Sequence, residues 1–98
     1  MTRDEALSIL RAHRAALADL GVTGLSLFGS LARDEAGPES DVDLIVEFDP
    51  AAHVGLFRYF DVKDYLEAIL GCQVDLVPRS GLKPRLRPSV ERDEIRVA

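Results

Sequence analysis

A glycine–serine pair and, ten residues later, two aspartates separated by one residue most constrain what this chain can fold into. Gly29 and Ser30 end one apolar run, and Asp41 and Asp43 open the next. Because residues two apart in a β-strand point to the same face, the two carboxylates are expected side by side. The pattern predicts two strands with polar groups gathered at one edge of a sheet.

The residue types at this edge indicate the chemistry. Neighbouring carboxylates repel each other unless a proton or a cation lies between them, and oxygen-only ligands favour a hard ion such as magnesium. Gly29 lets the backbone approach a ligand closely, and Ser30 offers a hydroxyl at the predicted first turn of a helix. Helix starts bind phosphate through their free N–H groups. These groups together predict a site for a nucleoside triphosphate and magnesium.

The aspartates also have simpler explanations. Asp41 alone could be a turn or cap residue, a common use of aspartate. That explanation does not cover Asp43, which stands inside a strongly apolar strand where aspartate is disfavoured. Asp75 is a third aspartate in an apolar run, and an unpaired buried charge is costly. It is expected either to complete the metal site or to pair with an arginine such as Arg33 or Arg79, and we favour the metal site.

Arg33 follows the glycine–serine pair closely and has two interpretations. It could reach the triphosphate or brace a neighbouring carboxylate. It could equally be a surface arginine paired with Asp34 or Glu35. The residues alone do not favour either interpretation.

The run from residue 29 to 33, together with residues 40–44, resembles the signature of the polymerase-beta-type nucleotidyltransferase superfamily. In this extended form it is similar to the minimal nucleotidyltransferase (MNT) branch. The resemblance covers nearly the whole chain, through residues 70–77 to residues 82–84. It implies an α+β, two-layer fold: a small mixed sheet of three to four strands with helices packed on it, formed by residues 1–98 as a single domain.

The resemblance also implies a reaction. Members of the MNT branch are antitoxins of HEPN-family ribonuclease toxins, and they transfer AMP from ATP to a tyrosine of the toxin. Two magnesium ions held by the carboxylates would fit a two-metal phosphoryl-transfer site. The residues implied are Asp41, Asp43 and Asp75 as catalytic metal ligands, and Gly29, Ser30 and Arg33 as nucleotide contacts.

A HEPN-family toxin is therefore the expected partner, in a hetero-oligomer. The 98 residues leave no room for a second domain that would hold a small substrate. The alternative is a non-catalytic antitoxin that masks its toxin by binding, with a vestigial nucleotide site. A small-molecule nucleotidyltransferase and a polymerase fit less well, because a substrate domain and a DNA-gripping domain are both missing.

The charge distribution argues against nucleic acid as a direct partner. The net charge is −5; residues 1–78 hold six Lys/Arg and fourteen Asp/Glu, whereas residues 79–98 hold six and three. The basic tail could fold over phosphates, meet an acidic partner or be a solvated helix face. Cys72 is the only cysteine, no apolar run approaches the roughly 20 residues of a membrane span, and the N-terminus is no signal peptide. A cytoplasmic protein is expected.

Apolar periodicity and turn residues predict the order of the elements. Phe57 and Phe60 are expected to pack in the core or to contact a partner, although together with Tyr59 they could instead stack on a base. Leu86 and Val90 are expected to face inward. His53 is interpreted as a loop histidine. The expected helices cover about residues 3–20, 30–35, 56–70 and 82–92, and the expected strands about residues 24–28, 41–48, 73–77 and 95–97, with a loop over residues 37–40.

Overall fold

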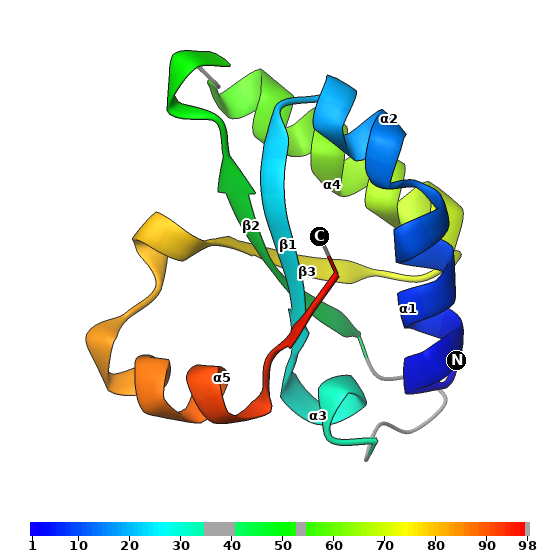
Figure 1. Ribbon diagram of the computed structural model, residues 1–98, viewed down its shortest axis with the longest axis vertical. Coiled ribbons are helices and arrows are strands. Elements are labelled where there is room, and N and C mark those ends of the chain that lie inside the picture. Colours follow the sequence, from blue (N-terminus) through cyan, green and yellow to red (C-terminus); the bar gives the residue numbers. More distant parts are fainter. Residues whose placement is uncertain (35–40, 53–54, 98) are drawn as a thin grey trace.

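A mixed sheet carries the rest of the fold (Figure 1). The computed structural model describes residues 1–34, 41–52 and 55–97, so the loop expected over residues 37–40 and His53 lie outside the described residues. The four strands of the described part are β1 (Val22–Phe28), β2 (Val42–Phe48), β3 (Val74–Pro78) and β4 (Ile95–Arg96). Their order is β3–β2–β1–β4; β1 is antiparallel to β2 and β4, and β2 is parallel to β3. The expected α+β fold with a small mixed sheet is confirmed.

Helices account for most of the remaining described residues. The α-helix over residues 56–70 has the expected bounds, whereas the one after β1 ends at Ala32, earlier than expected. No helix of the described ranges is long and apolar enough to cross a membrane. The helices are α1 (Arg3–Ala12), α2 (Arg14–Asp19), α3 (Gly29–Ala32), α4 (Leu56–Leu70) and α5 (Arg87–Asp93), with 3₁₀ turns η1 (Pro50–Ala52), η2 (Arg79–Gly81) and η3 (Pro84–Leu86).

The main core lies between one face of the sheet and helices α1, α2 and α4 (Figure 1). The alternation of β2 points Val42, Leu44 and Val46 into this core, and each is at most 1% exposed. α4 connects β2 to β3, because parallel neighbours need a crossover connection. Its buried residues are Val62, Leu66 and Leu70.

The chain after β3 covers part of the opposite face. Ile45 of β2 is 1% exposed there and packs with Leu82 and Val90. Asp43 points to this same face, because it stands two residues before Ile45 in the strand. The C-terminal segment therefore lies on the face that carries the candidate carboxylates.

The first helix is not continuous. The helix expected over residues 3–20 is divided at His13 into α1 and α2, so this expectation is wrong. The His13 N–H donates to Leu10 O, three residues back, and the His13 ring Nδ1 lies 2.8 Å from Ile9 O. The ring thus occupies the carbonyl that would accept the His13 N–H in a continuous helix. Apolar spacing does not reveal this break, because the residues on either side keep their helical period.

Three apolar side chains are exposed, so core packing of Phe57 and Phe60 and the inward position expected for Leu86 are wrong, whereas a partner contact of the two phenylalanines stays a prediction. Phe57 and Phe60 are 87% and 47% exposed in the first turns of α4, which lie beyond the end of β2 (Figure 1). Leu86 is 44% exposed, whereas Val90 is buried as expected. The reason is that Leu86 ends η3 and Pro88 stands in the first turn of α5, so Leu86 and Val90 do not share one helix face.

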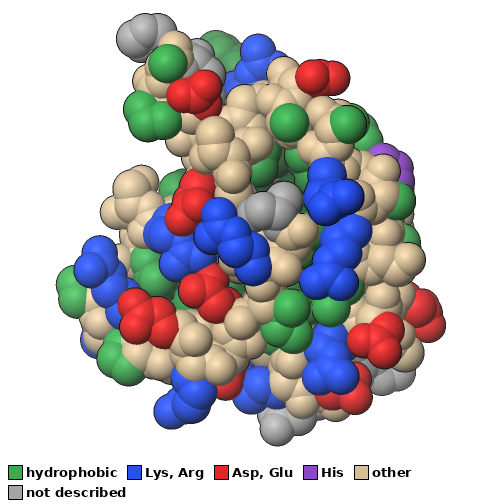
Figure 2. All heavy atoms as spheres, in the orientation of Figure 1, with side chains coloured by type: hydrophobic (Ala, Val, Ile, Leu, Met, Phe, Trp, Pro, Cys, Tyr) green, Lys and Arg blue, Asp and Glu red, His purple; other side chains and the backbone are tan. Residues whose placement is uncertain are grey.

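Ion pairs attach the C-terminal segment to the sheet. Arg79 Nε lies 2.6 Å from Glu47 Oε1 of β2, and Arg79 Nη2 donates to Glu94 Oε2 at 2.6 Å. Arg96 Nη2 lies 3.7 Å from Glu47 Oε2. Basic and acidic side chains lie next to each other on the face seen in Figure 2. Part of the basic tail is therefore engaged within the molecule.

This network predicts a pH-dependent stability. The hydrogen bond from Arg79 lowers the pKa of Glu94; burial opposes this, while Ser26 and the charges of Arg79 and Arg96 add to the lowering. A carboxylate whose folded-state pKa is depressed stabilises the fold above its unfolded-state pKa, and that contribution disappears as the pH falls through the folded-state pKa. Glu94→Gln should therefore lower the unfolding free energy by about 1–2 kcal/mol near neutral pH, and this deficit should shrink as the pH falls below the ordinary glutamate range through the folded-state pKa.

Urea unfolding followed by circular dichroism at several pH values measures this difference. Glu91→Gln, which replaces an exposed carboxylate of α5 three residues before Glu94, is the control and should give a curve parallel to the wild type. A Glu94→Gln deficit that stays constant down to acidic pH would contradict the ionic role of Glu94.

Candidate active site

Strand register brings Asp43 and Asp75 together. They are Cα partners on the parallel strands β2 and β3, and on its other side Asp43 is paired with Phe28, the last residue of β1. Asp41 precedes β2 by one residue. The three predicted carboxylates therefore lie at one end of the sheet, on adjacent strands.

The electrostatics of Asp43 reflect this crowding of negative charge. Burial is the main cause that raises the pKa of Asp43, and the charges of Asp75 and Asp41 raise it further, while Arg33 opposes the rise. The ionised form of Asp43 is thus disfavoured in the folded chain, and a cation beside it would relieve that cost.

Asp75 corrects part of the sequence argument. Its side chain is exposed, so the cost of burying an unpaired charge does not explain its position. The alternative of an ion pair with Arg79 or Arg33 is not what the described residues show, because Arg79 pairs with Glu47 and Glu94 and Arg33 pairs with Asp93. Register with Asp43 is the observation that places Asp75 at the site.

Gly29 is the first residue of α3 and forms the turn by which the chain leaves β1, called here the glycine turn. Its backbone lies against Asp43. Its φ of +75° is in the left-handed region that favours glycine. A Cβ on Gly29 would overlap Oδ2 of Asp43 and lie 3.1 Å from the Asp43 carboxyl carbon. Ser30 follows in the first turn of the short helix α3, as expected, and is partly buried. Gly29 and Asp43 are thus direct neighbours.

Arg33 is paired in a way that sequence reasoning missed. Its Nη1 donates to Oδ2 of Asp93, the last residue of α5, at 3.1 Å. The expected surface alternative paired Arg33 with Asp34 or Glu35, and Glu35 lies outside the described residues. No spacing rule connects residues so far apart in sequence.

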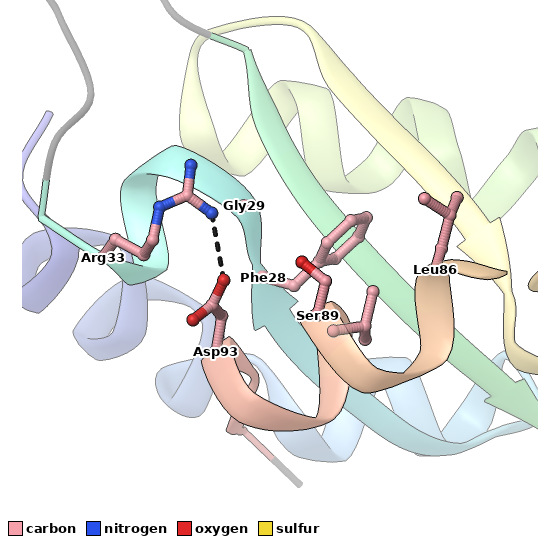
Figure 3. A pocket seen from close by; sticks show the side chains of 7 residues that line it. Phe28, Gly29, Arg33, Leu86, Ser89 and Asp93 are labelled. Carbon is pink, nitrogen blue, oxygen red and sulfur yellow. Dashed lines mark hydrogen bonds and ion pairs between the residues drawn. The ribbon is translucent and has the colours of Figure 1, made fainter.

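A cavity of about 160 Å³ opens between α3 and α5 beside this ion pair (Figure 3). Its lining combines apolar side chains with polar ones, which come from Arg33 after the glycine turn and from α5. The lining residues are Phe28, Gly29, Arg33, Leu86, Ser89, Val90 and Asp93.

The donor set fits a hard cation by chemistry. Asp41, Asp43 and Asp75 offer only oxygen ligands, the kind that magnesium prefers, and the raised pKa of Asp43, caused first by burial and then by Asp75 and Asp41, shows negative charge in need of compensation. Within residues 1–34, 41–52 and 55–97, no three His, Cys, Asp or Glu side chains are already converged on a point where a metal ion could be held.

A comparison with protein families identifies the class. A family model described as a nucleotidyltransferase domain matches residues 10–97. The chain belongs to the nucleotidyltransferase domain family. The match includes the strands and the glycine turn that form the candidate site, and this nucleotidyltransferase is accordingly an enzyme by family.

Known relatives place the nucleotidyltransferase among the MNT proteins, as the sequence resemblance implied. Protein adenylyltransferase MntA of Thermococcus cleftensis is 40% identical over 98 residues, which are 99% of this chain and 97% of the relative. A solved candidate minimal nucleotidyltransferase has a TM-score of 0.82 at 37% identity, covering 97% of this chain and 95% of its own. A solved complex of a tri-AMPylated Shewanella oneidensis HEPN toxin with an MNT antitoxin has a TM-score of 0.66 at 18% identity, over 94% of this chain and 71% of that one. The last likeness shows the fold alone.

Proposed function

We propose that this nucleotidyltransferase transfers AMP from ATP, with magnesium, to a tyrosine hydroxyl of a HEPN-family toxin and thereby acts as its antitoxin. The proposal depends on one observation: Gly29, Asp43 and Asp75 lie next to one another at one end of the sheet. The name of the Thermococcus cleftensis relative, a protein adenylyltransferase, and the AMPylated toxin complex of Shewanella oneidensis support the choice of reaction and partner.

The family resemblance suggests the roles, and the positions of Gly29, Asp43 and Asp75 support them. Asp41 and Asp43 would hold two magnesium ions, with Asp75 as a further ligand. Magnesium would neutralise charge on the triphosphate and lower the pKa of the acceptor hydroxyl. The glycine turn and the hydroxyl of Ser30 would hold the β- and γ-phosphates, with Arg33 as a further cationic contact. Positioning and charge neutralisation account for most of the rate in such a reaction.

The transfer balances without any further reactant. The acceptor oxygen forms a bond to the α-phosphorus of ATP, and the bond from that phosphorus to the oxygen bridging to the β-phosphate breaks. Pyrophosphate leaves, the hydroxyl proton passes to solvent, and AMP remains on the acceptor. The toxin is inactivated by the added group and not by the complex alone.

The test is intact-mass spectrometry of the candidate HEPN partner after incubation with this chain, ATP and magnesium. A mass gain of one AMP or a multiple of it is expected. The double variant Asp41→Ala/Asp43→Ala is the control and should give no gain. A stable complex with no mass gain in either sample would contradict AMP transfer and leave a masking antitoxin as the explanation.

A further inference from the structure

The Arg33–Asp93 ion pair links the glycine turn to the C-terminal helix. The two charged atoms are 3.1 Å apart, and the Asp93 side chain is only 13% exposed while that of Arg33 is 42% exposed. Figure 3 shows the two side chains pointing toward each other from α3 and α5. The carboxylate is therefore the covered member of the pair, and the guanidinium is the member that remains accessible.

The residues on either side of Asp93 are held in place by their own contacts. Val90, one turn earlier in α5, is buried with Ile45 and Leu82. The next residue, Glu94, is paired at 2.6 Å with Arg79, which in turn contacts Glu47 of β2. The position of Asp93 is thus supported by packing and ion pairs that do not involve the three candidate carboxylates.

Arg33 in turn lies close to the candidate nucleotide contacts. Its backbone N–H donates to Gly29 O at 3.2 Å, and its positive charge opposes the rise in the pKa of Asp43 that is caused first by burial. A guanidinium carries five N–H donors in a fixed planar arrangement, and Nη1 donates to Asp93. Arg33 therefore lies close to Gly29, and its guanidinium is already oriented by the ion pair with the Asp93 carboxylate.

We propose that Asp93 is a positioning residue that holds the Arg33 guanidinium in place for the triphosphate of ATP. This inference rests on the function proposed above. Arginine side chains lose much rotamer freedom when a ligand immobilises them. An arginine that a fixed carboxylate has already ordered loses less of it on binding, and the ligand binds more tightly.

A purely structural clamp between α3 and α5 is the competing explanation. Both explanations predict a less stable protein when Asp93 is replaced. They differ in the size of the two single effects: a clamp makes Asp93→Asn and Arg33→Gln weaken ATP binding equally. A positioning residue acts on ATP only through Arg33, so Arg33→Gln must cost more than Asp93→Asn, and the effect of Asp93→Asn must vanish once Arg33 is gone. A double-mutant cycle measures that dependence directly.

The experiment measures the dissociation constant of magnesium-ATP by calorimetry for the wild type, Asp93→Asn, Arg33→Gln and the double variant. Asp93→Asn should weaken ATP binding roughly five- to tenfold, and the double variant should match Arg33→Gln within about twofold. Asp93→Glu, which retains the carboxylate, should recover most of the affinity. Glu91→Gln, an exposed carboxylate on the same helix, should bind ATP like the wild type.

Each other outcome has a defined meaning. Independent, additive effects of the two substitutions overturn the inference, and so does tighter ATP binding in Asp93→Asn, which would mean that the carboxylate competes for Arg33. Asp93→Ser replaces Asp93→Asn in the cycle if the latter does not fold. A wild-type chain that does not bind ATP overturns this inference and the proposed function together. A chain that binds ATP and shows the coupling but transfers no AMP overturns only the proposed function.

Discussion

Asp43→Asn should lower the rate of AMP transfer about a thousandfold or more and leave the protein folded. Asp43 lies between Phe28 and Asp75 at one end of the sheet, and an amide supplies no negative charge to a metal ion. A metal ion contributes several kcal/mol of transition-state stabilisation, and each 1.36 kcal/mol is a factor of ten in rate. The loss should appear in kcat and not only in KM.

The same substitution should not destabilise the fold. The pKa of Asp43 is raised by burial and by the charges of Asp75 and Asp41. A carboxylate with a raised folded-state pKa costs stability when it is ionised, so a neutral residue of similar shape relieves that cost at neutral pH. The melting temperature of Asp43→Asn is therefore expected to equal or exceed that of the wild type.

Initial rates from intact-mass time courses and thermal melts of the same samples test both expectations. Asp64→Asn, an exposed aspartate on α4, is the matched control and should change neither quantity. Normal turnover in Asp43→Asn would refute its assignment as a metal ligand. A large fall in melting temperature would instead assign Asp43 a structural role.

The part of the site that is local in sequence was predictable. Asp41 and Asp43 are two residues apart, and the period of a strand is enough to place them on one face. The proximity of Asp75 depends on the register between β2 and β3, which no local pattern encodes; the family resemblance pointed to it. The argument from burial reached the same residue for a wrong reason, because Asp75 is exposed.

What could not be predicted depends on contacts between distant segments. The Arg33–Asp93 ion pair joins two short helices whose relation depends on how the tail folds back over the sheet. The break at His13 arises because its ring binds the Ile9 carbonyl, and the spacing of apolar residues does not reveal this contact. The exposure of Phe57 follows from where α4 begins relative to the sheet. In each case the observed feature depends on contacts in three dimensions, which neither the amino-acid composition nor the spacing of apolar residues specifies.

Gly29→Ala should reduce AMP transfer at least about a hundredfold, because a displacement of about 1 Å at a reacting group can cost that much. Two effects act on this variant. An alanine at φ +75° is strained, at a cost of about 1–2 kcal/mol. The new Cβ would also overlap Oδ2 of Asp43 and lie 3.1 Å and 3.2 Å from its Cγ and Cβ, so the Asp43 side chain has to move.

Gly71→Ala separates the two effects. Gly71 ends α4 at φ +70°, and a Cβ there would meet no other atom within 4 Å. Both alanine variants should therefore lose a similar free energy of unfolding, measured by urea titration, while only Gly29→Ala loses transferase activity. Because the nearest atom to the new methyl group belongs to the end of a side chain, Asp43 can rotate away without unfolding the sheet. Equal activity of the two variants would show that the close approach of Gly29 to Asp43 is not needed for catalysis.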